Sequence, residues 1–489
     1  MSAVDPRQPV IVGAGQLNDR DHGSEPIDLM VRCTEAALGD TGAAASIRSR
    51  LDAVRVVWGV WPYRDPGRLL ADRIGATEAT STITTLGGNQ LYDLVTDTAL
   101  RIQRGDLDTV VICGAESLRT RRGDRARGRK TPYLAERDGA RPDEVFGSDR
   151  DLSSETEREI GVDVAARFYA MAETALRHRL DEDLDGHRLR IAELWARASR
   201  IAVDNPDAWS RTPVDATEIA TESPANRPVA SPYPKLMTSN LNVDQGGAVI
   251  MCSAGAAIAA GVPPERWIFP WSGVGVADEW CVTSRWAFDE SPGMQLSGSR
   301  ALALAGVHHD DCKLIDLYSC FPVAVQLAQR ELGIDPGRDF TITGGLTFAA
   351  GPLNCYCILP LTRAVHLLRE SPDERAFLTG NGGSFTKHSA LVLAGTASTA
   401  GFRTDDVHAI VDALPTRPSP NGPVADATLE TYTVTFDRDM QPERAILACL
   451  DDAGSRHWAE STDAATMQDL LSTDCCDRPV RLDGRTAHL

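Results

Sequence analysis

Two stretches of this 489-residue chain follow one pattern, and the repeat limits the folds that are open to it. Residues 87–117 read GGNQLYDLVTDTALRIQRGDLDTVVICGAES, and residues 351–384 read GPLNCYCILPLTRAVHLLRESPDERAFLTGNGGS. Each consists of a glycine turn, a long helical pattern, a polar link, an apolar strand and a glycine-containing turn. Matching order over nearly matching length indicates a duplicated α/β half.

Short apolar runs alternate with helical patterns in the rest of the N-terminal part. Residues 8–15 and 51–60 predict strands, and residues 25–42 predict an amphipathic helix that ends at glycines. The run at 107–117 is apolar without alternation, as expected for the buried centre of a mixed or parallel sheet. At 347–356 (TFAAGPLNCY) we expect a strand that passes through a Gly-Pro turn into a buried helix. The chain is therefore expected to be an α/β protein.

The pattern changes at two places along the chain. From about residue 119 charge rises and strands give way to helical patterns and turns, which indicates an inserted region. After about residue 400 apolar and polar residues alternate with turn signals, which is typical of a small antiparallel β domain. We therefore expect four units: a first α/β half (residues 1–118 and 241–264), an inserted loop domain (119–240), a second half (265–401) and an additional β domain (402–489).

Composition excludes several classes of protein. The formal net charge of −19 argues against a nucleic-acid binder that uses its whole surface. The N-terminus lacks the pattern of a signal peptide, and no run of about 18 apolar residues predicts a membrane span. The eleven cysteines are an odd number in apolar contexts, which fits reduced thiols in the cytoplasm better than a disulfide framework.

Few side chains offer chemistry on the sequence alone. Cys320, between a predicted strand and a predicted helix, is the best placed nucleophile, and His388, beyond a glycine turn, is the best candidate base. The alternative is a buried structural cysteine and a histidine with satisfied hydrogen bonds. We expect no metal site, because the HHDDC run at 308–312 predicts an exposed turn and no cysteine pair has zinc-site spacing.

One segment is strongly basic in this acidic chain. Residues 119–130 contain one Asp and seven cations, which are Arg119, Arg121, Arg122, Arg125, Arg127, Arg129 and Lys130. The functional hypothesis is a site for the phosphates of a nucleotide-like ligand. The alternative is a solvated loop that balances local charge.

Several short motifs stand in a telling order: VIVGAGQ, VVICGAES, NVDQGGAVIMCS, DLYSCF, GGLTFAAGPL and LTGNGGS. Together they resemble the thiolase superfamily over about residues 5–400, closest to the sterol-carrier-protein-type thiolases and their thiolase-like relatives. The last three resemble the family's His-Asp-Cys-Phe, Gly-His-Pro and Cys-x-Gly motifs. The resemblance implies a five-layered αβαβα sandwich of two similar halves, with a loop domain inserted in the first.

The resemblance also implies where catalytic groups would stand. A thiolase cysteine takes the acyl group as a thioester, and further Cys, His and Asn side chains move protons and stabilise the oxyanion. Carried over, the nucleophile falls on Gly87, or on Gly88 with a one-residue shift. The remaining positions fall on Tyr318, Gly351 and Gly380. Because glycine has no group that attacks or transfers a proton, the family's conventional chemistry is not expected here.

Residues after about 402 are similar to the OB-like small barrels that are fused to, or partnered with, thiolase-like proteins carrying an extra C-terminal domain. The function implied is binding of CoA or an acyl-CoA thioester in lipid metabolism, with no cofactor. One alternative is an acyltransferase that uses Cys320 and His388. Another is a scaffold whose C-terminal domain binds a protein or nucleic acid, although the acidic, aromatic-poor tail disfavours nucleic acid.

The resemblance bears on assembly too. Thiolases usually dimerise through the strand before the nucleophile turn, which corresponds to TSTITTLGG at 80–88. Its alternating threonines can still pair with a partner strand, but the additional domain obstructs a partner. We therefore expect a monomer rather than a dimer.

Overall fold

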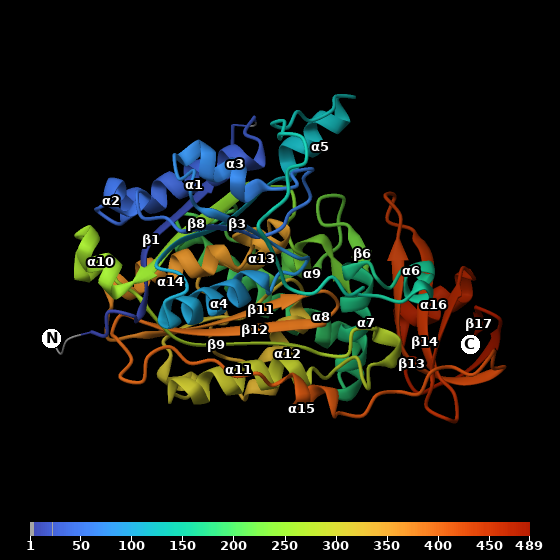
Figure 1. Ribbon diagram of the computed structural model, residues 1–489. Helices are drawn as coiled ribbons and strands as arrows, with labels where there is room; N and C mark the ends of the chain where they lie inside the picture. The colour runs from blue at the N-terminus through green and yellow to red at the C-terminus, as the bar shows by residue number, and fades with distance from the viewer. Residues whose placement is uncertain (1–3, 22) are drawn as a thin grey trace.

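The structure is a computed structural model that describes residues 4–21 and 23–489, and two β-sheets form its centre (Figure 1). The first sheet has the strand order β1-β8-β4-β2-β3-β5, and the second has the order β10-β11-β12-β9. The first sheet consists of β1 (Pro9–Asn18), β2 (Ala53–Val56), β3 (Thr80–Thr84), β4 (Thr109–Ser117), β5 (Glu144–Phe146) and β8 (Asp244–Ser253). The second consists of β9 (Phe269–Ala277), β10 (Leu314–Asp316), β11 (Arg375–Gly382) and β12 (Lys387–Ala394).

Helices separate and cover the two sheets, which gives five layers (Figure 1). One pair of helices packs on the outer face of the first sheet, a second pair lies between the sheets, and a third pair covers the second sheet. These pairs are α1 (Pro26–Asp40) with α3 (Pro66–Ile74), α4 (Gln90–Arg104) with α14 (Ile358–Glu370), and α11 (Pro292–Ala305) with α12 (Pro322–Leu332). The predicted αβαβα sandwich is confirmed.

The repeated segments occupy equivalent places in the two halves. In the first, a glycine turn leads into α4 and then into β4, and in the second a glycine turn leads into α14 and then into β11. Both helices lie in the central layer between the sheets. α4 ends at Gly105, whose φ of 87° is the left-handed cap that the sequence predicts.

Two predicted strands differ from the structure. The residues before Gly351 form a short helix, α13 (Gly345–Phe348), and not a strand. Gly344 and Gly345 both adopt positive φ, 104° and 70°, and this turns the chain out of an extended path. The strand before Cys320, β10, ends at Asp316, so that a turn separates it from the cysteine.

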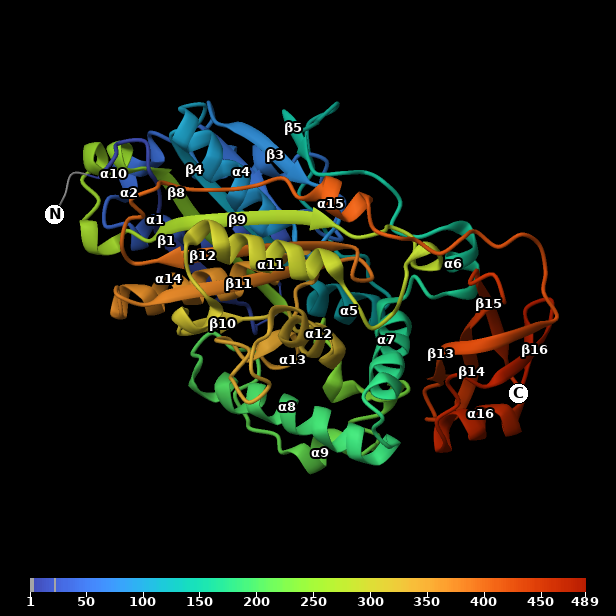
Figure 2. The same ribbon diagram turned by 90° about the horizontal axis from the view of Figure 1, so that it is seen from below.

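Residues 119–240 form a mainly helical region, with short strands that join two different sheets. Its helices are α5 (Leu118–Ala126), α6 (Glu155–Ile160), α7 (Ala165–Arg179), α8 (Leu184–Asp204) and α9 (Ala216–Ala220). Figure 2 shows α8 and α9 lying outside the second half of the sandwich. Within this region β5 joins the first sheet, while β6 (Pro228–Ala230) and β7 (Tyr233–Pro234) join the sheet of the C-terminal domain. Strands this short carry no readable alternation.

The edge of the first sheet is completed by the chain itself. β5 pairs in parallel with β3, the strand through which the family resemblance predicted a dimer contact. Buried Arg55 of β2 forms ion pairs with Asp97 at 2.7 Å and with Glu144 of β5 at 3.6 Å. Arg101 of α4 binds both acids, at 2.9 and 2.5 Å. Because a buried guanidinium must be paired, these contacts tie β5 to α4.

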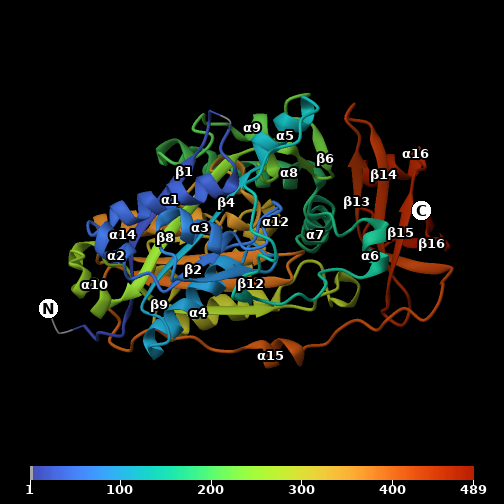
Figure 3. The same ribbon diagram turned by 45° about the horizontal axis from the view of Figure 1, so that its top comes forward.

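The C-terminal domain forms a barrel-like arrangement at the end of the molecule beside α6 and α7 (Figure 3). Its strands follow the order β14-β15-β17-β16-β13, and an additional β14–β13 pairing closes the ring. The elements are β13 (Asp426–Phe436), β14 (Pro442–Leu450), β15 (Arg456–Ser461), α16 (Ala464–Ser472), β16 (Pro479–Asp483) and β17 (Thr486–His488). No helix within residues 4–21 and 23–489 is long and apolar enough to cross a membrane.

Replacing Glu144 with Gln is expected to lower the free energy of unfolding by about 1 kcal/mol at neutral pH, because two guanidinium groups lose a charged partner. Partial burial raises the pKa of the Glu144 carboxyl, but the hydrogen bond from Arg101 and the charge of Arg55 outweigh it and hold the pKa below its ordinary value. The ionised carboxylate therefore stabilises the fold above a pH of about 4.5, and this contribution is lost as the pH falls.

Denaturant unfolding of the wild type and of Glu144→Gln, at about pH 7 and about pH 3, measures this difference and should find it smaller in acid. The matched control is Glu35→Gln, which removes an acid from the more exposed pair between Arg48 and Glu35 and should change stability by less than about 0.5 kcal/mol. Equal losses in the two variants would contradict the role given to β5.

Candidate functional site

A pocket of about 440 Å³ lies where the inserted region meets the second half of the sandwich. Its wall combines the start of α7, the turn before α4, the turn between β10 and α12, and the end of β11. The lining residues are Gly88, Val164, Ala165, Ala166, Tyr169, Val229, Thr238, Ser239, Leu241, Tyr318, Cys320, Phe321, Leu346, Gly351, Leu353, Asn354, Asn381, Gly382 and Gly383. The DLYSCF, GGLTFAAGPL and LTGNGGS motifs thus all contribute residues to one cavity.

The nucleophile position has no room for a side chain. Gly88, and not Gly87, lines the pocket. A Cβ atom on Gly88 would lie 2.4 Å from the Tyr318 hydroxyl oxygen and 2.5 Å from the carbonyl oxygen of Asn381. Both separations are far inside van der Waals contact, so a cysteine at this position requires the pocket wall to move.

Tyr318 takes the space that a catalytic side chain would need. Its backbone N–H donates to Thr379 Oγ1 at 3.0 Å, and its ring packs edge-on against Tyr356 with the ring centres 5.5 Å apart. Burial raises the pKa of the Tyr318 phenol well above its ordinary value, so the group stays a neutral hydroxyl. The side chain can donate a hydrogen bond but does not act as a base.

Gly351 and Gly380, the other two glycines at positions where the family has catalytic residues, differ in their surroundings. Gly351 lines the pocket, and a Cβ there would meet Leu346 at 3.2 Å and Ser239 at 3.4 Å. Gly380 does not line the pocket. Its Cβ would lie 2.8 Å from Ser389 Oγ, in the packing between β11 and the start of α4. The structure therefore brings Gly88, Tyr318 and Gly351 together and leaves Gly380 behind the wall.

Cys320 lies in the pocket wall just before α12, with 7% of its surface exposed. A helix N-terminus favours the thiolate, but burial dominates and raises the pKa of the Cys320 thiol to about 12. The group is therefore a neutral thiol near pH 7. It is reachable from the pocket and is a poor nucleophile.

His388 is not part of the pocket, so the structure does not bring it together with Cys320. On β12, its Nε2 contacts the Phe385 carbonyl oxygen at 2.9 Å, Ser291 Oγ at 3.0 Å and an Asp278 carboxylate oxygen at 3.2 Å. Burial raises the pKa of the Asp278 carboxyl, but His388 outweighs it and holds the pKa below its ordinary value. His388 is therefore part of a buried polar cluster beside the N-terminus of α11.

The polar groups that remain in the pocket are neutral, and motif reasoning missed most of them. Asn381 donates from Nδ2 to the Tyr169 hydroxyl at 2.9 Å, and that hydroxyl donates to the Gly383 carbonyl at 3.0 Å. Asn354 bridges the Gly87 N–H and the Trp58 carbonyl. Only the LTGNGGS motif signalled Asn381, whereas Tyr169 sits in an ordinary helical pattern. Among the described residues, no charged side chain lines this pocket.

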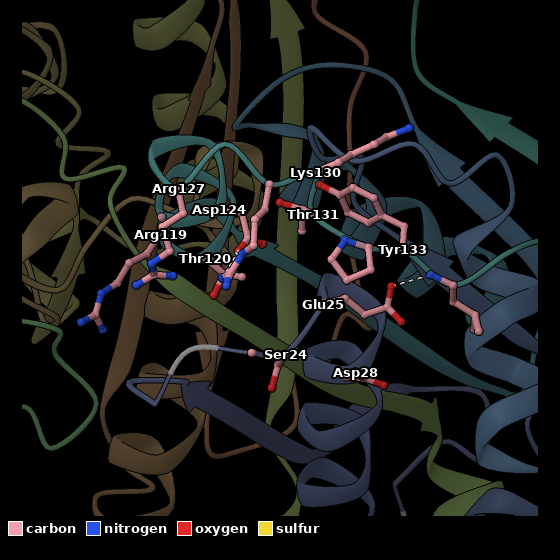
Figure 4. Close-up of a pocket in the computed structure, with 15 residues that line it drawn as sticks. Ser24, Glu25, Asp28, Arg119, Thr120, Asp124, Arg127, Lys130, Thr131 and Tyr133 are labelled. Carbon is pink, nitrogen blue, oxygen red and sulfur yellow. Dashed lines mark hydrogen bonds and ion pairs between the residues drawn. The ribbon is translucent and has the colours of Figure 1, made fainter.

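The basic segment lies at the surface and lines two other pockets. Arg119, Arg127, Arg129 and Lys130 contribute to one of about 780 Å³ beside Glu25 (Figure 4). Arg121 and Arg125 join Arg129 and Lys130 in a second, of about 1000 Å³, whose wall includes Trp58, Trp61, Tyr63 and Tyr133. Arg122 lines neither, and none of the seven lines the 440 Å³ pocket.

The HHDDC run forms a single 3-10 turn, His309–Asp311, and is only partly exposed, because His309 and Cys312 are buried. His308, His309 and Asp310 bring candidate ligand atoms within 4.8 Å of one another there. Two of the three are exposed, and solvated acids of this kind commonly hold no ion. The turn carries no metal assignment.

Comparison with known proteins finds similarities both for the C-terminal domain and for the whole chain. Residues 406–484 match the family model described as the thiolase-like protein type 1 additional C-terminal domain. A monomeric SCP2-thiolase-like protein type 1 from Mycobacterium smegmatis is similar over 100% of both chains, with 29% sequence identity and a TM-score of 0.86. No curated protein sequence matches the chain.

More distant solved structures have the same fold. Human mitochondrial 3-ketoacyl-CoA thiolase in complex with CoA is 18% identical over 80% of this chain and 99% of its own, with a TM-score of 0.57. The Ltp2-ChsH2(DUF35) aldolase is 19% identical over 80% and 98%, with a TM-score of 0.60. At these identities the likeness concerns the fold alone.

The crowding at Gly88 predicts that Gly88→Ala lowers the free energy of unfolding by about 2 kcal/mol or more, because its methyl group overlaps Tyr318 and a fixed backbone carbonyl. The matched control is Gly39→Ala in the last turn of α1, where a Cβ meets nothing within 4 Å. That change should stabilise the chain by about 0.5 kcal/mol. Denaturant unfolding compares the two, and a Gly88→Ala protein as stable as the wild type would mean that a nucleophile fits after all.

Proposed function

We propose that this chain, which carries the additional C-terminal domain of thiolase-like protein type 1 on a thiolase fold, binds an acyl-CoA thioester without performing conventional thiolysis or Claisen condensation. The observation that carries the proposal is the corner around Gly88. A pocket is kept where the family places its catalysis, while the hydroxyl of Tyr318 and the carbonyl of Asn381 fill the space of a nucleophile.

The lining of the pocket supports a neutral, largely apolar ligand group. Eight of the nineteen lining residues are valine, alanine, leucine or phenylalanine, and hydroxyl and amide groups of Tyr169, Tyr318 and Asn381 supply hydrogen bonds. A volume of about 440 Å³ lies within the range of small-molecule sites. An acyl chain with its thioester has this chemistry, whereas a phosphate does not, because a buried phosphate needs cations.

The available groups argue against turnover. Burial raises the pKa of the Cys320 thiol to about 12, so the thiol stays neutral near pH 7. His388 contacts Asp278 and Ser291 and does not line the pocket, so it is not placed to accept the proton of the Cys320 thiol. The acyltransferase alternative through Cys320 and His388 would need both groups to move.

We place the phosphates of the ligand on the basic segment. Four of its seven cations line the 1000 Å³ surface pocket together with aromatic rings that suit a purine. Asn354, in the wall of the 440 Å³ pocket, donates to the carbonyl of Trp58, which lines that surface pocket. One hydrogen bond thus links the walls of the two cavities. If the segment is only a solvated loop, its charges should have no effect on binding.

Calorimetry with acetoacetyl-CoA tests the pocket. Ala166→Trp, which fills the pocket, should weaken binding about tenfold or more, and Ala45→Trp on the exposed face of α2 (Ala44–Arg48) should leave it unchanged. The wild type should show no thiolysis beside an active thiolase as control. Lack of binding at millimolar ligand would end the proposal, and turnover that Cys320→Ala abolishes would instead favour the acyltransferase.

The basic segment has its own test. Arg121→Ala combined with Arg125→Ala should raise the dissociation constant of acetoacetyl-CoA about fivefold, at about 0.5 kcal/mol per lost contact, and should reduce its dependence on salt. Arg50→Ala, an exposed cation outside these pockets, is the control. An unchanged constant and salt slope would place the phosphates elsewhere.

We further propose that the chain is a monomer and that its C-terminal barrel is OB-like. β5 covers the edge of β3, which supports the first point, and five strands closing on β13 with a helix between the third and fourth support the second. Light scattering during size-exclusion chromatography should give the mass of one chain, and a stable dimer would contradict it.

Lipid metabolism in the cytoplasm remains the proposed setting, in keeping with eleven free cysteines.

A further inference from the structure

The C-terminal barrel turns one of its faces into the rest of the chain. Successive strand residues point to opposite sides, so one set fills the barrel and the other faces outward. Six residues of the outward set on β13, β14 and β15 are almost completely buried, each with at most 6% of its surface exposed. These residues, the barrel seat, are Thr431, Thr433, Ile446, Ala448, Arg456 and Trp458.

The barrel seat is fastened to α7, the helix that begins in the wall of the 440 Å³ pocket. Thr431 donates from its hydroxyl to the carbonyl of Met171 at 2.6 Å. Near the other end of the helix Arg177 and His178 bind Asp474 at 2.8 and 2.7 Å. β13 also packs along α7, so the helix is held over its length by the domain and not by a few surface contacts.

Aromatic rings continue this contact into the pocket. Trp458 meets Phe288 with the ring centres 6.2 Å apart, Phe288 meets Phe168 at 6.0 Å, and Phe168 precedes Tyr169 on α7. Tyr169 then stacks on Phe321 at 4.7 Å, and both line the pocket. A displacement of Trp458 therefore reaches the pocket wall through rings in direct contact.

A buried arginine fastens the opposite side of the seat. Arg456 pairs with Glu430 at 2.6 Å and donates to the carbonyl groups of Val282, Thr283 and Arg285. Arg285 in turn donates to the carbonyl of Ser384, next to the Gly383 that lines the pocket. The seat thus holds both the helix and the turn that enclose the cavity.

We infer that the C-terminal barrel is a positioning element of the pocket, which sets α7 and the 382–385 turn, and is not a module with a free binding face. In OB-like barrels the face of the second and third strands takes the ligand. Here the corresponding face of β14 and β15 is occupied by the chain itself, which leaves it closed to nucleic acid or to a partner protein. The inference concerns the shape of the pocket and holds whatever its ligand is.

The reactivity of Cys320 tests this without any ligand. The thiol lines the pocket, whereas Cys113 of β4 is fully buried in the first sheet and reports opening of the whole core. Labelling with iodoacetamide, followed by peptide mass spectrometry, gives both rates in one sample. Trp458→Leu should speed the labelling of Cys320 about tenfold while leaving Cys113 unchanged.

The matched control loosens the barrel away from its seat. Leu482→Ala on β16 opens a cavity inside the barrel and should keep the Cys320 rate within about twofold of the wild type at a comparable loss of Tm. Should Trp458→Leu fail to fold, Thr431→Val, which removes one hydrogen bond, should speed Cys320 about threefold. Equal rates in seat and control variants, or equal acceleration of Cys113, would overturn the inference.

Discussion

The approach of α4 to the second sheet is the contact on which the rest of this structure depends. A Cβ on Gly273 would lie 2.1 Å from Thr96 Oγ1, and one on Gly275 would lie 2.2 Å from an Asp93 carboxylate oxygen. Strand β9 therefore touches the helix with its bare backbone, which fixes the spacing of the central layer. The start of α4 also lies close to β11, because a Cβ on Gly380 would lie 3.1 Å from the Cα of Asn89. The crowding at Gly88, next to Asn89, belongs to the same close approach.

The sequence predicted the parts of the fold that repeat or that carry long periodic patterns. The glycine turn, helix and strand around α4 and around α14 are both recognisable, because a buried helix of 13–15 residues leaves a clear apolar pattern. Strands β5 and β6 were not recognisable, because a few residues carry no period and their partners lie far away in the chain. The turn before Gly351 was misjudged, since two glycines allow backbone shapes that composition does not reveal.

The sequence predicted which catalytic side chains are absent from the candidate site better than it predicted which residues line the pocket. A glycine at a catalytic position is visible in the sequence, and Gly88 and Gly351 do line the pocket. The pairing of Cys320 with His388 was not decidable, because Asp278 and Ser291, which bind His388, come from about a hundred residues away. Burial then decides the chemistry, since the same thiol at a solvated helix start would be far more acidic.

The strand that completes the first sheet has a thermodynamic consequence. β5 reaches β3 through a loop of the same chain, so the entropy cost of their pairing is that of closing a loop during folding. An edge covered by a second subunit would instead be lost on dilution, because its population follows the concentration of protomers. The corner at Gly88, a few residues beyond β3, is therefore as well formed in one isolated molecule as in a concentrated solution.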